Sequence, residues 1–320
     1  MNRIILIMAL SAALVSCGGR TAKTSAPPQA EATFPMPSVP GLITDPAERL
    51  SWLCLHFWDD FTAEGRTGRC DSSHVAGVPR DAVEEQFGLF STLLVHADLK
   101  TIKDAMDHLY ERAAACEMRD ASSNVFETFV ELTAHYFFDP NSPIRNEECY
   151  LHFVERLAES PLVSEGMRAA YAYDAGICRL NRPGTAAADF RFTDLGGHTR
   201  TLYGIKAPYT LLFFSNPGCE SCKEVMDMLQ SSEMITDLIS SGTLAVVNVY
   251  IDDALDEWKA YAVNYPSSWY SGYDADYAIR TDMRYAVRAI PSLYLLDENK
   301  TVIYKDAYPD FLMETLSNVQ

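Results

Sequence analysis

The sequence predicts a two-domain protein, with an all-α domain over residues 42–183 followed by an α/β domain over residues 184–320. In the first segment, apolar residues recur at spacings of three and four, which is typical of amphipathic helices. In the second, apolar runs of strand length alternate with helical patterns, which favours a sheet covered by helices. The length of 320 residues is also what about two domains require.

The composition restricts the compartment and the partners. An apolar content of 48% with 11% aromatic residues is that of a folded protein rather than a disordered one. A formal net charge of -18 argues against a nucleic-acid partner. Eight cysteines fit an oxidising compartment better than the cytosol.

The chain begins with a short positive start and an apolar run, Ile4 to Val15, which is too short to span a bilayer. That pattern predicts a signal peptide over residues 1–16. The run ends in Leu-Val-Ser-Cys17, which resembles the lipobox of bacterial lipoproteins. The resemblance implies that Cys17 becomes the lipidated first residue of the mature protein. An ordinary secretory signal with a chance cysteine is the alternative.

The residue after Cys17 is Gly18, whereas many such lipoproteins that are retained in the inner membrane have aspartate at this position. The resemblance therefore implies a lipid anchor in the outer membrane, with the protein facing the periplasm. Residues 17–41 are rich in Thr, Ala, Ser and Pro, which predicts a flexible tether between this anchor and the folded part.

The helical domain is predicted to contain five or six helices. The first begins at Thr44-Asp45-Pro46, where a capping residue is followed by proline. Further helices are expected from residue 80 and over 99–116, 125–136, 147–158 and 165–180. The stretch from His56 to Asp60 spreads its polar side chains over different helix faces, so we interpret it as core aromatics beside a solvated helix end.

Five cysteines are scattered over this domain, about one in each element, so at least one of them is unpaired or pairs elsewhere. Candidate bridges join Cys54 with Cys70 and Cys116 with Cys149, although connectivity cannot be deduced from sequence. Because cysteines on apolar helix faces behave as small hydrophobes, we expect buried free thiols, Cys178 included. No pair has the spacing of metal ligands, so neither a metal nor another cofactor is predicted.

The C-terminal domain carries a Cys-x-x-Cys motif between a strand and a helix. An apolar run, Tyr209 to Phe214, leads through Pro217-Gly218 into Cys219 and Cys222, and a helical pattern follows. The unpaired N–H groups and positive end of a helix stabilise a thiolate at the first cysteine. A zinc site would need two more Cys or His, and this domain offers only His198. The motif therefore predicts a redox dithiol.

The order of strand, Cys-x-x-Cys helix, central strand 244–251 and Ile290-Pro291 before a hairpin resembles the thioredoxin fold. The leading Ala-Asp-Phe hairpin is similar to that of the ResA/TlpA-like thiol oxidoreductases. This resemblance implies that Cys219 is the exposed nucleophile, Cys222 the buried resolving thiol and Pro291 a cis-proline. It also implies that the backbone of Ile290 binds an extended substrate chain. The helical domain resembles uncharacterised domains that precede thioredoxin-like domains in some lipoproteins, which implies no activity.

The motif departs from this family in three ways. Pro-Gly replaces the usual Trp before the first cysteine, Phe213 stands where thioredoxin has a buried Asp, and Glu224 is one residue out of register from an acid of ResA-like proteins. We expect Glu224 to face solvent. The carboxylate of Glu220 raises the pKa of Cys219, while Lys223 and the helix lower it. We predict that the reduction potential of the Cys219–Cys222 pair is nearer to the value of thioredoxin, about -270 mV, than to that of DsbA, about -120 mV.

These observations predict a membrane-tethered thiol–disulfide oxidoreductase that reduces disulfides of periplasmic proteins without a cofactor. Cys219 attacks the client disulfide, Cys222 resolves the mixed disulfide, and an unidentified thiol reductant restores the pair. A redoxin-type peroxidase is the first alternative, although the loop before Cys219 lacks the Thr or Ser that such enzymes use. The second is a binding protein in which the helical domain acts and the thioredoxin fold is a scaffold.

Overall fold

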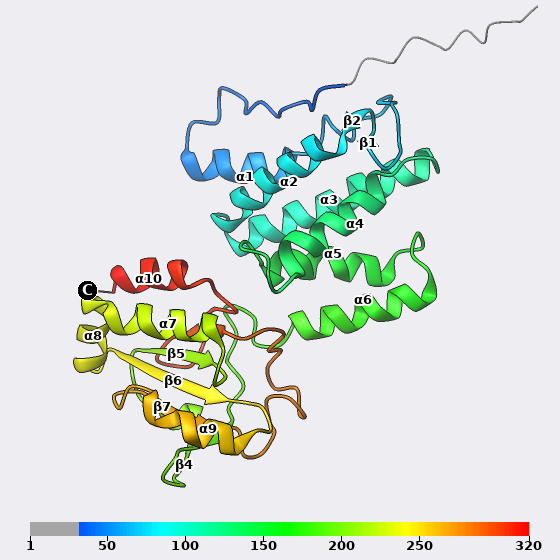
Figure 1. Ribbon diagram of the computed structural model, residues 1–320. Helices are drawn as coiled ribbons and strands as arrows, with labels where there is room; N and C mark the ends of the chain where they lie inside the picture. The colour runs from blue at the N-terminus through cyan, green and yellow to red at the C-terminus, as the bar shows by residue number, and fades with distance from the viewer. Residues whose placement is uncertain (1–31, 320) are drawn as a thin grey trace, which may run out of the picture. The chain divides into compact units, whose positions relative to one another are not determined.

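The computed structural model describes residues 32–319 as a helical region followed by an α/β region (Figure 1). The predicted signal peptide, Cys17 and the first part of the predicted tether lie outside the described residues. Among residues 32–319, no helix is both long enough and apolar enough to cross a membrane.

The predicted helices of the first region are present. They are α1 (Pro46–His56), α2 (Arg80–Val95), α3 (Leu99–Arg119), α4 (Val125–Thr133), α5 (Glu147–Glu159) and α6 (Glu165–Cys178). Asp45 caps α1 through its side chain, as the sequence predicts. A π-helical turn (Ala134–Phe138) extends α4. A small hairpin of β1 (His74–Val75) and β2 (Val78–Pro79), which the sequence analysis does not predict, precedes α2.

The core of the helical region is aromatic. Trp58, Phe87 and Phe129 are buried, and the Trp58 and Phe129 rings meet edge-to-face at 4.6 Å. Phe34 also packs there, with its ring 5.3 Å from that of Phe61. The expectation of a flexible tether up to residue 41 is therefore wrong around Phe34, because an aromatic side chain gains more from burial than a polar linker does.

The second region is built on one sheet. In the described part of the chain, seven strands pair in the order β4-β3-β7-β6-β5-β8-β9. The strands are β3 (Arg191–Thr193), β4 (Thr199–Thr201), β5 (Tyr209–Phe214), β6 (Leu244–Tyr250), β7 (Tyr270–Tyr273), β8 (Ser292–Leu296) and β9 (Val302–Tyr304). β5 is parallel to β6 and antiparallel to β8. This is the predicted α/β architecture, and the outer strands β3, β4, β8 and β9 pair antiparallel to their neighbours.

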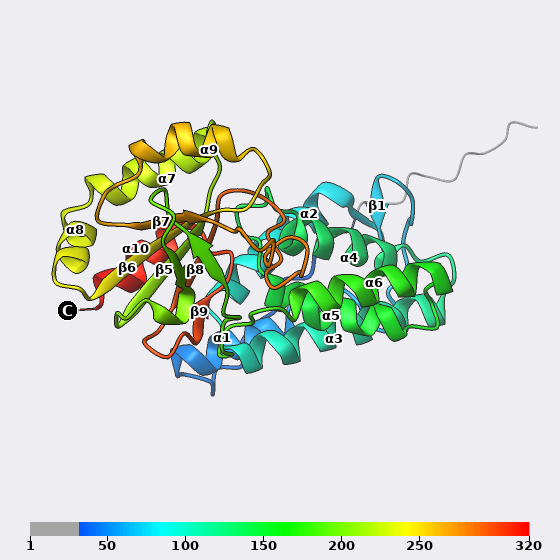
Figure 2. The ribbon, with the colours of Figure 1, turned by 90° about the horizontal axis from the view of Figure 1, so that it is seen from below.

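Helices cover one face of this sheet. Side chains of α7 (Glu220–Ser231), α9 (Leu255–Tyr261) and α10 (Pro309–Ser317) share one buried cluster with the strands. Figure 2 shows α7 and α9 beside the strands. α8 (Glu233–Ser240) follows α7 directly and is not foreseen in the sequence analysis. The opposite face is buried mainly by irregular segments, including residues 278–287.

Residues 276–287 form turns, because Asp274 accepts hydrogen bonds from the backbone N–H groups of Ala278 and Ile279 and so holds a non-helical backbone. The aromatic connection after α9 contains strand β7, which pairs with β6.

Candidate active site

The candidate site lies at the carboxyl end of β5, where the Cys-x-x-Cys motif begins α7. Cys219 is the N-cap residue of this helix, and Cys222 lies in its first turn. The turn before it needs glycine at one position, since Gly218 has a φ of +74°. The local sequence thus delivers both sulfurs to a helix N-terminus, as the pattern predicts.

The two cysteines are joined by a disulfide, with their Cα atoms 5.2 Å apart. Cys222 is 5% exposed, whereas Cys219 is half-buried. Of the two sulfurs, that of Cys219 is therefore the more open to an incoming thiol. This difference fits the roles that the resemblance implies, which stay predictions.

The loop before β8 lies against the disulfide. The Ile290–Pro291 peptide bond is cis, as the resemblance implies. The carbonyl oxygen of Ile290 lies 3.8 Å from the Cys219 sulfur. This contact follows from strand register, because the first residue of β8, Ser292, pairs with Phe214, the last residue of β5.

The charged residues of α7 point away from the core. Glu220 and Glu224 are exposed, so Glu224 faces solvent as expected. The Lys223 amine lies 2.6 Å from the Asp227 carboxylate, in an exposed pair. Because this cation already has a partner, it stabilises a thiolate at Cys219 less than the sequence analysis supposes.

Beneath the motif lies a polar group that sequence reasoning missed. The buried hydroxyl of Ser215 donates to Asn248 Oδ1 over 2.6 Å and lies 3.4 Å from the Tyr265 hydroxyl. One signal was available, since Asn248 interrupts the apolar run of β6. These contacts anchor the backbone just before the Pro-Gly turn.

The stretch from His56 to Asp60 agrees with the sequence analysis in part: Phe57 and Trp58 are core aromatics as expected, but its polar side chains converge. The carboxylate of Asp59 bonds both His56 Nδ1, over 2.7 Å, and His108 Nε2, over 2.6 Å. The side chains converge because α1 ends at His56 and Arg112 of α3 holds the following turn by donating to the Asp59 carbonyl and the Thr62 hydroxyl. Burial raises the pKa of Asp59, but the two histidine hydrogen bonds outweigh it, and the net pKa lies below its usual value.

The cysteines of the helical region are free thiols. Cys54, Cys116, Cys149 and Cys178 are buried, as the sequence analysis expects, and Cys70 is half-exposed. The candidate bridges between them are not formed. Within residues 32–319, no group of three or more His, Cys, Asp or Glu side chains is placed to hold a metal ion.

Comparison with known proteins divides the chain in the same way. Residues 16–181 match the model of a domain of unknown function (DUF5106), and residues 208–302 match that of a thioredoxin-like domain. The search of curated proteins found no similar sequence.

Solved structures from Bacteroides are similar to this chain. A thioredoxin-like protein from Bacteroides caccae is 33% identical, with a TM-score of 0.78 over 90% of this chain and 99% of that one. The C-terminal domain of an uncharacterised protein from Bacteroides fragilis is 42% identical, with a TM-score of 0.42 over 43% of this chain and 99% of that one. The first of these likenesses spans both regions. The chain therefore belongs to the DUF5106 family, and its C-terminal part is a thioredoxin-like domain.

Proposed function

We propose that this protein is a thiol–disulfide oxidoreductase that reduces disulfides in other proteins. The observation that carries the proposal is the Cys219–Cys222 disulfide at the start of α7, with the Ile290 carbonyl oxygen 3.8 Å from the sulfur of Cys219. A helix N-terminus stabilises the thiolate, and the neighbouring backbone offers a place for an extended client chain.

The reaction begins with the reduced pair. The Cys219 thiolate attacks one sulfur of a client disulfide, and the other client sulfur leaves as a thiolate. Cys222 then attacks the Cys219 sulfur of the mixed disulfide, which releases the client as a dithiol and leaves the Cys219–Cys222 disulfide. A partner thiol reductant supplies two electrons and two protons to restore the pair.

The direction of electron flow rests on the charges around the motif. Glu220 is exposed beside Cys219, and Lys223 is paired with Asp227. Both features weaken the stabilisation of the Cys219 thiolate, so the reduced pair is a stronger reductant than it would be with a well-stabilised thiolate.

We also propose that the protein is anchored to the outer membrane and faces the periplasm. The proposal rests on the lipobox-like sequence that ends at Cys17, which would carry the lipid.

The test is a titration of the Cys219–Cys222 pair against glutathione or dithiothreitol, read by alkylation and mass spectrometry. We expect a reversible disulfide with a midpoint below about -230 mV. A midpoint near -120 mV would make the protein an oxidant, as DsbA is. The absence of any reversible disulfide between these cysteines would end the redox proposal.

A further inference from the structure

The helical region reaches the candidate site through one buried carboxylate. Glu147, the first residue of α5, is 8% exposed. Arg288 Nε donates to its Oε1 over 2.9 Å. Lys305 Nζ lies 2.6 Å from its Oε2 as an ion pair. Both cations belong to the thioredoxin-like domain, so this carboxylate of the helical region binds two of that domain's segments at once.

Arg288 is also held by the helical region in other ways. Its Nη1 donates to the backbone carbonyl of Phe138, and its guanidinium lies 4.0 Å from the centre of the Phe138 ring. That ring stacks on Tyr150 of α5 at 4.1 Å. The arginine side chain is only 16% exposed. A planar guanidinium bonded along its edge and stacked on its face has one position available to it.

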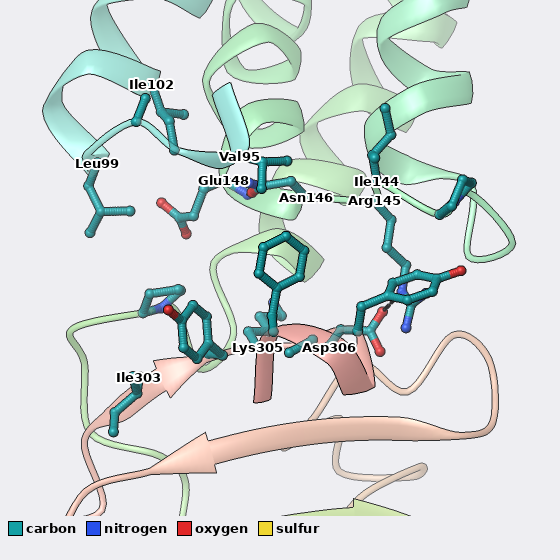
Figure 3. A pocket seen from close by; sticks show the side chains of 17 residues that line it. Val95, Leu99, Ile102, Ile144, Arg145, Asn146, Glu148, Ile303, Lys305 and Asp306 are labelled. Carbon is teal, nitrogen blue, oxygen red and sulfur yellow. Dashed lines mark hydrogen bonds and ion pairs between the residues drawn. The ribbon is translucent and has the colours of Figure 1, made fainter. Parts of the chain in front are cut away.

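Lys305 lies in the connection between β9 and α10. Its amine donates to the carbonyls of Cys178, over 3.0 Å, and Leu180, over 2.6 Å, where the chain leaves α6. A cation at the carboxyl end of a helix is favoured both by the free carbonyls and by the helix dipole. Beside it, Asp306 accepts from Arg145 Nε over 2.9 Å. Figure 3 shows Lys305, Asp306 and Arg145 around a cavity of about 180 Å³ between the two regions.

One of these two segments contacts the disulfide, and the other lies beside the strand that follows it. Arg288 stands three residues before Pro291, in the loop whose Ile290 carbonyl faces Cys219. The β9–α10 connection runs beside the start of β8, since the Ala307 N–H donates to Leu293 O over 3.0 Å. The Glu147 carboxylate therefore fixes the loop before Pro291 relative to the β9–α10 connection.

We propose that Glu147 is a positioning residue, which holds the loop of residues 288–291 in place for an extended client chain. The inference rests on the proposed function and adds a role for the helical region within it. A client protein must pair with the backbone of this loop, so a fixed loop lowers the entropy lost on binding. A small disulfide needs only the Cys219 sulfur. The loop therefore serves protein clients selectively.

The test compares Glu147→Gln with the matched control Glu148→Gln in the full chain. Glu148 is next in sequence and 5% exposed, and its carboxylate bonds Arg182, which lies in neither loop. Each protein is assayed on insulin, as a protein disulfide, and on the small disulfide of Ellman's reagent. The midpoint potential of the Cys219–Cys222 pair is measured as well.

We expect Glu147→Gln to lower kcat/KM for insulin about 10-fold, mainly through KM, because the loop is misplaced. Its rate on Ellman's reagent stays within about twofold and its midpoint potential is unchanged, since the sulfurs and their helix are intact. The control keeps all three values of the wild-type protein. Equal losses on both disulfides, or no loss on insulin, would overturn the inference.

A second pair of variants guards against loss of folding in Glu147→Gln. Arg288→Lys keeps the cation, whereas Arg288→Leu removes it, and circular dichroism checks that both are folded. We expect the leucine variant to reproduce the selective insulin defect and the lysine variant to show a smaller defect of the same kind, because lysine keeps the charge but loses the guanidinium's planar hydrogen bonds and its stacking on Phe138. Two equally active variants would contradict the inference. A wild-type chain inactive on both disulfides would refute the proposed function itself, and the inference with it.

Discussion

The sulfur of Cys219 lies 3.8 Å from the carbonyl oxygen of Ile290, a residue 71 positions further along the chain. The antiparallel pairing of β5 with β8 brings the two together, because it aligns the end of one strand with the start of the other. The reactive sulfur and the backbone proposed to bind the client thus lie together at one end of the β5–β8 strand pair. A sulfur placed this way can be tested as a nucleophile directly.

The first prediction separates the roles of the two cysteines. Cys219→Ser should lower disulfide reduction by about 1,000-fold or more, because the thiolate nucleophile is lost. Cys222→Ser should still attack a client but cannot resolve the product, so a mixed disulfide accumulates on Cys219. Non-reducing electrophoresis with peptide mass spectrometry detects this adduct. Accumulation on Cys219→Ser instead would reverse the assignment of roles.

The second prediction concerns the charges of the first turn of α7. Glu220→Gln removes an exposed carboxylate beside Cys219, stabilises the thiolate and should raise the midpoint potential by roughly 10 mV. Lys223→Met should shift the potential the other way and by less, because Asp227 already neutralises this amine. The redox titration measures both. A larger effect from Lys223→Met would show that the pair with Asp227 does not screen the site.

The local part of the site could be predicted from the sequence. A strand, a Pro-Gly turn and two cysteines opening a helix lie within a single stretch of chain, and each has its own residue signal. Gly218 adopts the positive φ that this turn requires. Neighbouring residues decide such features, so a linear pattern is enough to find them.

The contacts between distant segments could not be predicted in that way. Glu147 and Arg288 are 141 residues apart, and nothing in either residue type points to the other. The convergence of His56 and His108 on Asp59 was missed because a single helix was expected to continue past His56. Such features depend on where whole elements pack, which residue spacing along one element does not contain.

The third prediction ranks the thiols of the reduced protein by reactivity. Burial raises the pKa of Cys54 to about 12, and it also raises the pKa values of Cys149 and Cys178. At pH 8 only about one Cys54 side chain in 10,000 is a thiolate. Iodoacetamide should therefore alkylate Cys219 and the half-exposed Cys70 first, as peptide mass spectrometry would show.

Unfolding the reduced protein in urea supplies the control for this ranking. All cysteines should then react at similar rates, because burial no longer raises their pKa values. If Cys54 in the folded protein reacted as fast as Cys70, the aromatic core around α1 would have to open readily.

The fourth prediction uses the Asp59 cluster. The folded-state pKa of Asp59 is lowered, so the carboxylate contributes stability that is present above its unfolded pKa of about 3.9. That contribution is lost as the pH falls through the lowered folded-state value. Asp59→Asn should reduce the free energy of unfolding by roughly 1 kcal/mol at pH 7. The difference from the wild-type protein should shrink as the pH falls below about 4.

Urea unfolding at a series of pH values measures this difference. The neighbouring Asp60→Asn is the matched control, because Asp60 is exposed and the variant loses a carboxylate from the same turn. It should change the unfolding free energy little at any pH, since surface substitutions have small effects. A deficit of Asp59→Asn that persisted undiminished at pH 3 would mean that packing, and not the charge held between His56 and His108, accounts for the stability at this position.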